Sequence, residues 1–151
     1  MAGAMASFPS ALFLREAEVR RGLELMFAGQ AELARAIQPI LDDAKIGRAH
    51  QRALYFIGRQ QDLSVGGLLA KLGITKQSLN RVLTDLTARG LVETRVGRDD
   101  RRQRLLRLTD EGKALEARLF EAMRARLASA YAQAGQQAVG GFWAVLEGLS
   151  G

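Results

Sequence analysis

The sequence contains no cysteine and a single histidine among its 151 residues. Without cysteine the chain has no disulfides, no thiolate metal ligands and no cysteine-based redox sensing. The one histidine, His50, excludes a zinc site built from several histidines. A histidine-based catalytic triad and a glycine-rich phosphate loop are also absent, so no enzyme class is favoured and we expect no cofactor and no metal.

Long apolar runs are also absent. No run approaches the roughly 20 residues that a membrane-spanning helix needs. Residues 1–10 lack the basic start and the apolar centre of a signal peptide, and we interpret them as a mobile tail. We therefore expect a cytoplasmic protein with no membrane contact.

The positive charge is concentrated in the middle of the chain. The whole chain has 22 basic and 16 acidic residues, and residues 48–107 hold 13 of the basic and 5 of the acidic ones, a balance of +8. The remainder has 22 − 13 = 9 basic and 16 − 5 = 11 acidic residues, a balance of −2. A basic middle favours contact with a polyanion, although a solvated basic surface would give the same count.

Helical periodicity dominates the first third of the chain. Apolar residues recur at helical spacing from residue 11 into the thirties, and Pro39 is expected to kink or break that helix. A second helix is expected over residues 47–59.

Two short amphipathic helices follow, joined by a tight turn. Ser64 is a candidate N-cap for the first, Gly73 follows it, and Thr75 is the candidate N-cap of the second, which Gly90 closes. This arrangement is typical of a helix-turn-helix.

The outward face of the second helix is polar and has no central carboxylate. Gln77, Arg81 and Thr84 lie opposite its leucines, with Asn80 and Lys76 at the sides. Glutamine and asparagine pair with adenine and arginine with guanine, so the face suits base edges and phosphates, with an ordinary solvated face as the alternative.

A basic hairpin is predicted directly after this helix. Residues 91–96 and 104–108 read as short strands, and the loop GRDDRRQ between them has the composition of a hairpin tip. Such a hairpin is a wing, whose arginines can enter a minor groove or bind phosphates. One of the two aspartates can pair with a neighbouring arginine and hold the wing in one shape, unless both are simply solvated.

The C-terminal third is expected to be helical, with apolar faces that need packing partners. Thr109 is a candidate N-cap for a long helix that ends near Gly135, and a last helix carries Phe142 and Trp143. Both are apolar on one face, so we expect the first and last segments to pack together and against a second copy. Trp143 and Phe142 belong either to this interface or to ordinary core, and we favour the interface.

The order of these parts resembles the MarR family of winged helix-turn-helix regulators. The resemblance rests on residues 63–112, above all on the wing pattern D-x-R and the strand ending in L-T, here Asp100, Arg102, Leu108 and Thr109. It implies a mainly α fold with a small β-hairpin wing. It also implies that residues 47–108 form a DNA-binding domain and that residues 11–46 and 109–151 form the dimerisation regions on either side of it.

The resemblance also implies a homodimer that binds a pseudo-palindromic site in double-stranded DNA. The recognition helix enters a major groove, and the residues carried over to it are Thr75, Lys76, Gln77, Ser78, Asn80, Arg81 and Thr84. Arg102 would enter a minor groove with Arg101 beside it, Arg98 and Arg104 complete the basic wing, and Asp100 would brace it.

Most members of that family repress transcription, and many release DNA when a small, often aromatic or phenolic, ligand binds. His50, Tyr55 and Phe56 lie on the helix that would border the ligand crevice, although core packing is the explanation we favour for them. The leading hypothesis is therefore a sequence-specific transcriptional regulator. Three alternatives remain: a nonspecific architectural DNA-binding or RNA-binding module, an enzyme, and an adaptor that has lost DNA binding.

Overall fold

The structure is a computed structural model that describes residues 12–151, so the predicted tail at residues 1–10 lies outside the described residues. The chain divides into two compact units, residues 1–35 and residues 36–151. In the first unit the described chain is almost entirely the beginning of helix α2 (Glu16–Ala44), and the second unit contains all the other helices and strands described. No helix in residues 12–151 is long and apolar enough to cross a membrane.

Helix α2 continues through Pro39 to Ala44, so the expected break at this proline does not occur. Proline in a helix interior costs about 3 kcal/mol, through a lost hydrogen bond and a clash of its ring. Ile37 and Leu41 on either side of it are 3% and 1% exposed. Burying two such side chains contributes about 3–6 kcal/mol, which exceeds the cost of the proline and keeps the segment helical.

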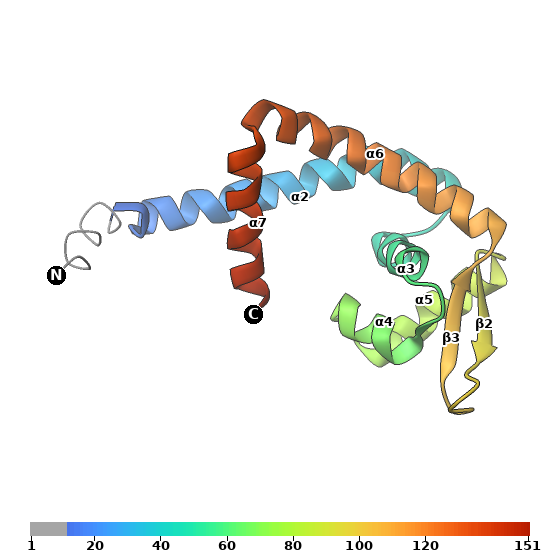
Figure 1. The fold of residues 1–151 in the computed structure, drawn as a ribbon. Coiled ribbons are helices and arrows are strands. Elements are labelled where there is room, and N and C mark those ends of the chain that lie inside the picture. The colour runs from blue at the N-terminus through green and yellow to red at the C-terminus, as the bar shows by residue number, and fades with distance from the viewer. Residues whose placement is uncertain (1–11) are drawn as a thin grey trace. The chain divides into compact units, whose positions relative to one another are not determined.

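The second unit has the predicted order of elements (Figure 1). Helix α3 (Arg48–Arg59) is followed by α4 (Val65–Leu72) and α5 (Lys76–Ala88), then by strands β2 (Val92–Val96) and β3 (Arg104–Leu108). The chain ends with α6 (Asp110–Ala134) and α7 (Gln136–Ser150).

The predicted caps are confirmed. The side chains of Ser64, Thr75 and Thr109 each accept a hydrogen bond from a backbone N–H in the first turn of α4, α5 and α6. Gly73 and Gly90 follow α4 and α5 with positive φ angles of 64° and 73°. Because glycine adopts this conformation without steric cost, the turn between α4 and α5 is short and its geometry is defined.

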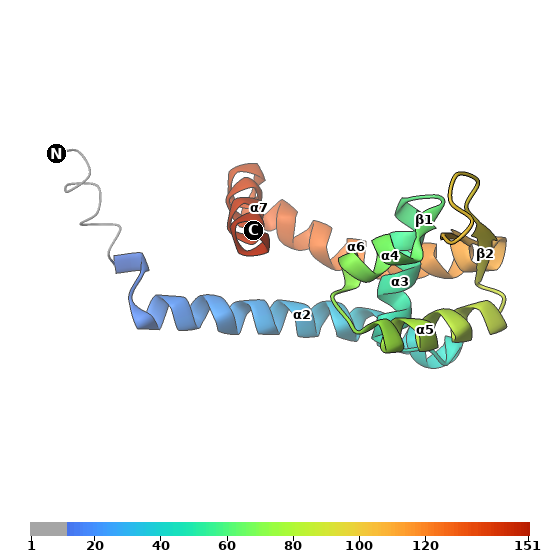
Figure 2. The ribbon, with the colours of Figure 1, turned by 90° about the horizontal axis from the view of Figure 1, so that it is seen from below.

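A third strand joins the predicted hairpin. The two-residue strand β1 (Leu63–Ser64) pairs with β3, which gives an antiparallel sheet in the order β1-β3-β2. Two residues are too few for alternation to be visible in a sequence, so this strand was not predicted. Figures 1 and 2 show the β2–β3 hairpin projecting beyond α3, α4 and α5.

One apolar core in the second unit joins the end of α2, helices α3 to α6 and the three strands. Its fully buried side chains come from α2, α3, α4, α5, β3 and α6: Leu41, Leu54, Ile57, Leu68, Leu79, Leu86, Leu106 and Leu119. Helix α5 and the hairpin therefore pack on the same core, which places their outward faces next to each other in one lobe.

The base of the hairpin is fastened to α6 at Thr109. The Thr109 N–H donates to the Leu91 carbonyl over 3.1 Å, and the Thr109 hydroxyl donates to the Gly90 carbonyl over 2.6 Å. The Gly112 N–H donates to that same hydroxyl over 3.0 Å. The backbones approach so closely that a Cβ on Gly112 would lie 2.0 Å from the Leu91 oxygen.

A second link joins the loop before β1 to the wing. The Arg107 guanidinium donates two hydrogen bonds to the Asp62 carboxylate, Nε to Oδ1 over 2.6 Å and Nη2 to Oδ2 over 2.9 Å. These hydrogen bonds lower the pKa of Asp62, against the opposing effect of partial burial, and the charge of Arg107 and then of Arg95 lowers it further.

This ion pair predicts a loss of stability at acid pH. Because the folded-state pKa of Asp62 lies below the unfolded value, its contribution is present above the unfolded pKa and disappears as the pH falls through the folded pKa. We expect Asp62→Asn to lower the free energy of unfolding at pH 7 and to have little effect once the wild-type carboxyl is protonated. Urea unfolding from pH 7 to pH 2.5 measures this, and an equal effect of the substitution at both extremes would contradict it.

Candidate nucleic-acid interface

The seven residues predicted for the recognition helix lie in and just before α5, and the side chains of all of them are exposed: Thr75, Lys76, Gln77, Ser78, Asn80, Arg81 and Thr84. The opposite side of the helix carries Leu79, Val82 and Leu86, which are 0%, 6% and 0% exposed. The apolar side therefore fixes which polar side chains face solvent.

The beginning of α5 offers hydroxyl groups and free backbone donors. The Thr75 hydroxyl accepts the Ser78 N–H over 3.1 Å and donates to the Ser78 hydroxyl over 2.8 Å. The helix dipole places partial positive charge at this end, and Lys76 adds a full charge in the first turn. This end of α5 suits an anion such as a backbone phosphate.

The wing tip is a compact loop with outward-pointing arginines. The Gly97 N–H donates to the Gln103 carbonyl over 2.9 Å, and the Gln103 N–H donates to the Asp100 carbonyl over 3.0 Å. A Cβ on Gly97 would lie 2.6 Å from the Asp100 carbonyl oxygen, so this position has no room for a side chain. The four predicted wing arginines are all exposed: Arg98, Arg101, Arg102 and Arg104.

Of the two adjacent aspartates, only one contacts an arginine of the tip. Asp100 Oδ1 accepts the Arg102 backbone N–H over 3.0 Å and the Arg102 Nε–H over 3.3 Å. The Arg102 side chain is still 93% exposed, so its two terminal nitrogens point into solvent. Asp99 is exposed, and the structure gives it no contact of this kind.

The three residues predicted for a ligand crevice already have partners within the lobe. His50 Nε2 lies 2.9 Å from an Asp85 carboxylate oxygen, and His50 Nδ1 accepts the Gly47 N–H over 3.2 Å. The rings of Tyr55 and Phe56 are half-buried and meet edge to face, with centroids 5.4 Å apart. These are contacts of packing and capping.

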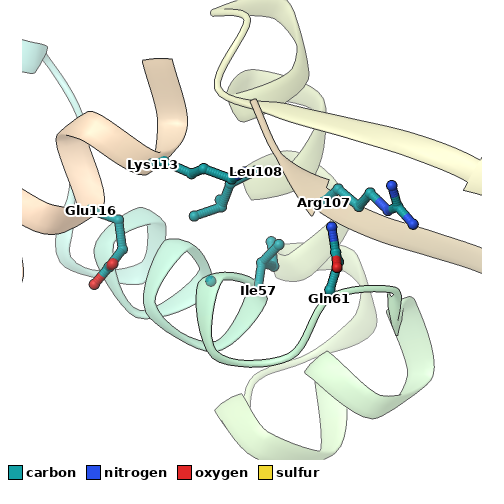
Figure 3. A pocket seen from close by; sticks show the side chains of 7 residues that line it. Ile57, Gln61, Arg107, Leu108, Lys113 and Glu116 are labelled. Carbon is teal, nitrogen blue, oxygen red and sulfur yellow. The ribbon is translucent and has the colours of Figure 1, made fainter. Parts of the chain in front are cut away.

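A cavity of about 300 Å³ lies elsewhere, between α3, β3 and α6 (Figure 3), and none of those three residues lines it: its lining is Ile57, Gly58, Gln61, Arg107, Leu108, Lys113 and Glu116. Partial burial raises the pKa of Glu116, although the charge of Arg59 opposes the shift. No sequence motif predicted this cavity, because its lining comes from three segments far apart in the chain. The same holds for the Asp62–Arg107 pair, whose members are separated by 45 residues.

Comparison with known proteins decides the family. The profile of the MarR family matches residues 45–103, the segment that includes the helix-turn-helix and most of the wing. The HTH-type transcriptional regulator PetP of Rhodobacter capsulatus is 50% identical over 138 residues, which cover 91% of this chain and 83% of that protein. The chain belongs to the MarR family.

Solved structures agree with this membership. The MarR-family transcriptional regulator from Silicibacter pomeroyi is 26% identical with a TM-score of 0.71, covering 83% of this chain and 84% of that one. NadR in complex with 4-hydroxyphenylacetate is 27% identical with a TM-score of 0.74, covering 84% of this chain and 89% of that one. The MarR fold class predicted from the sequence is confirmed. The protein is a winged-helix transcriptional regulator of this family and not an enzyme.

Proposed function

We propose that this MarR-family protein is a cytoplasmic, homodimeric repressor that binds a pseudo-palindromic site in double-stranded DNA. The observation that carries the proposal is the joint placement, on one apolar core, of an α5 face free of central carboxylates and a wing tip with four exposed arginines. A major groove admits a helix such as α5, and the adjacent minor groove attracts arginine.

In this proposal α5 reads the bases and its beginning binds the backbone. Gln77, Asn80 and Arg81 are long enough to form paired hydrogen bonds with base edges. Thr75, Lys76 and Ser78 surround the helix N-terminus and contact phosphates. The wing arginines add sequence-independent affinity, which falls steeply as the salt concentration rises.

The two adjacent aspartates of the wing, Asp99 and Asp100, provide a test of the interface with its own control. Asp100→Ala removes a negative charge near DNA, which alone would strengthen binding, but it also removes the two hydrogen bonds that hold Arg102. We expect Asp100→Ala to weaken binding, and the matched control Asp99→Ala to leave it unchanged or strengthen it. Both are measured by fluorescence anisotropy on one labelled duplex, and equal effects of the two variants would mean that Asp100 braces nothing.

A second copy of the chain is proposed to cover the apolar side chains of α7. Phe142, Trp143, Val145 and Leu149 are 43%, 51%, 62% and 67% exposed in the single chain, and none of the residues of α7 is buried. Exposed apolar patches of this kind mark an interface. Two lobes related by a two-fold axis would reach half-sites about one helical turn apart, roughly 34–36 Å.

The dimer is testable without DNA. Light scattering is expected to give a mass of about twice the 16.5 kDa of one chain for the wild type. We expect Val145→Glu to give monomers, because it places a charge in an apolar interface, whereas Gln137→Glu on the same helix is the control for added charge. A wild-type monomer, or a Val145→Glu dimer as stable as the wild type, would contradict this assignment.

A small aromatic or phenolic effector that releases the DNA is part of the proposal. NadR, a relative of this chain, was solved with the phenolic compound 4-hydroxyphenylacetate.

The alternative function is a nonspecific architectural DNA-binding protein, which would use the same wing without the base contacts of α5. An excess of random duplex separates the two, because it would displace the architectural protein from any site.

A further inference from the structure

A chain of polar contacts connects the recognition helix to the junction between α2 and α3. His50 Nε2 lies 2.9 Å from Asp85 Oδ2, and Arg89 Nε donates to the same oxygen over 3.0 Å. Arg89 Nη1 also donates to the carbonyl of Ala44 over 3.2 Å. Ala44 is the last residue of α2, where carbonyl groups have no partner within the helix, so Arg89 occupies an otherwise unmet acceptor.

The hydrogen bonds of His50 define one protonation state of the ring. Nδ1 accepts the Gly47 N–H over 3.2 Å at the beginning of α3, so this nitrogen carries no hydrogen. The proton of the neutral ring is then on Nε2, directed at Asp85. The His50 side chain is only 20% exposed, and its two nitrogens contact Asp85 on α5 and Gly47 at the beginning of α3.

The carboxylate of Asp85 is the one negative charge on α5. Hydrogen bonding from Arg89 lowers the pKa of Asp85, and the charge of Arg89 and the hydrogen bond from His50 lower it further against the effect of burial, so the group is ionised at neutral pH. Left unpaired, this charge would repel phosphates. Paired as it is, the carboxylate is held toward α3 and away from the polar face of the helix.

Apolar packing and these polar contacts constrain α5 differently. The buried leucines determine which side of α5 faces the core, but apolar contacts are non-directional and tolerate small rotations and shifts. Hydrogen bonds to a fixed partner are directional and remove that freedom. A base edge is recognised only when the side chain lies within a few tenths of an ångström of its position, whereas phosphate attraction tolerates misplacement.

We propose that His50 is a positioning residue for the recognition helix. By holding Asp85 through Nε2, and with Arg89 linking α5 to Ala44, it fixes the orientation of α5 and thereby sets sequence preference more than overall DNA affinity. The inference rests on the proposed DNA-binding function, and it assigns His50 to the protein's own scaffold and not to a ligand.

Two conservative substitutions separate this role from simple capping of α3. In His50→Gln the amide nitrogen occupies the place of Nε2 and keeps the donor to Asp85, while the acceptor for Gly47 is lost. In His50→Asn the amide oxygen occupies the place of Nδ1 and keeps the cap, while the reach to Asp85 is lost. Each variant therefore retains one half of the histidine's contacts.

Hydrogen exchange of the α5 amides is the first readout, and it needs no DNA. We expect faster exchange along α5 in His50→Asn than in His50→Gln, because only the asparagine variant loses the contact between His50 and α5. Nitrogen-15 spectra of the wild-type ring are expected to show Nδ1 without a hydrogen and Nε2 with one. The opposite tautomer, or equal exchange in the two variants, would overturn the proposal.

Preference between a native upstream duplex and a scrambled one is the second readout. We expect His50→Asn to lower this preference by about tenfold, the value of one paired base contact, with little change on the scrambled duplex. His50→Gln is expected to retain the preference. If His50→Asn kept the sequence preference and His50→Gln lost it, the role of His50 would be only to cap α3. If the wild type itself shows no preference, the proposed function fails, while the exchange and tautomer results still decide whether His50 orients α5.

Discussion

Replacing Gly112 with alanine is expected to destabilise the protein by about 3 kcal/mol or more, a large part of the 5–15 kcal/mol typical of a domain. Alanine is the better helix former by about 1 kcal/mol, so propensity alone predicts stabilisation. The added Cβ, however, would lie 2.0 Å from the Leu91 carbonyl oxygen, and that oxygen belongs to backbone that accepts the Thr109 N–H. The steric effect therefore outweighs the propensity.

Urea unfolding followed by circular dichroism measures this, with Gly66→Ala as the matched control. Gly66 is also in a helix, α4, but a Cβ there meets no atom within 4 Å. We expect Gly66→Ala to stabilise the protein by about 0.5–1 kcal/mol. If Gly112→Ala were as stable as the wild type, the close approach of α6 to the base of the wing would be wrong.

Replacing Arg102 with alanine is expected to weaken binding to every duplex by about tenfold and to reduce the dependence of log K on log salt by about 0.9. The reason is that the Arg102 side chain is 93% exposed at the wing tip, where its terminal nitrogens can reach a minor groove or a phosphate. Arg118→Ala, which removes the same charge from α6, is the control. Unchanged binding by Arg102→Ala would exclude the wing from the interface.

Arg81→Ala should behave differently from Arg102→Ala. Arg81 is exposed on the α5 face, so we expect a loss of about 1–3 kcal/mol on the preferred sequence and a smaller loss on others. Anisotropy titrations on a set of single-base variants of the duplex measure this. A uniform loss on all of them would assign Arg81 to a phosphate.

Local signals in the sequence predicted the helices and the hairpin because their causes are local. Ser64, Thr75 and Thr109 act within four residues of their own positions, and the apolar period of α5 is visible in thirteen residues. The break considered at Pro39 does not occur, because the burial of Ile37 and Leu41 depends on packing partners that a local pattern does not contain.

The candidate site was predictable only in part for the same reason. The exposed face of α5 and the wing arginines follow from periodicity and composition. The links that orient them do not, because Asp62 meets Arg107 and Asp85 meets His50 across long stretches of chain. Core packing was the favoured explanation for His50 and a ligand crevice the alternative, and nothing in the sequence indicated that both of its nitrogens have protein partners.

The most direct test of the central claim is a fluorescence-anisotropy titration of the protein on labelled duplexes. Duplexes from the region upstream of the protein's own gene are compared with scrambled duplexes of equal length at two salt concentrations. A sequence-specific regulator predicts binding of one dimer with a preference of about a hundredfold or more for the native sequence, within the range of specific over nonspecific binding. No binding to either duplex at low salt would contradict the account.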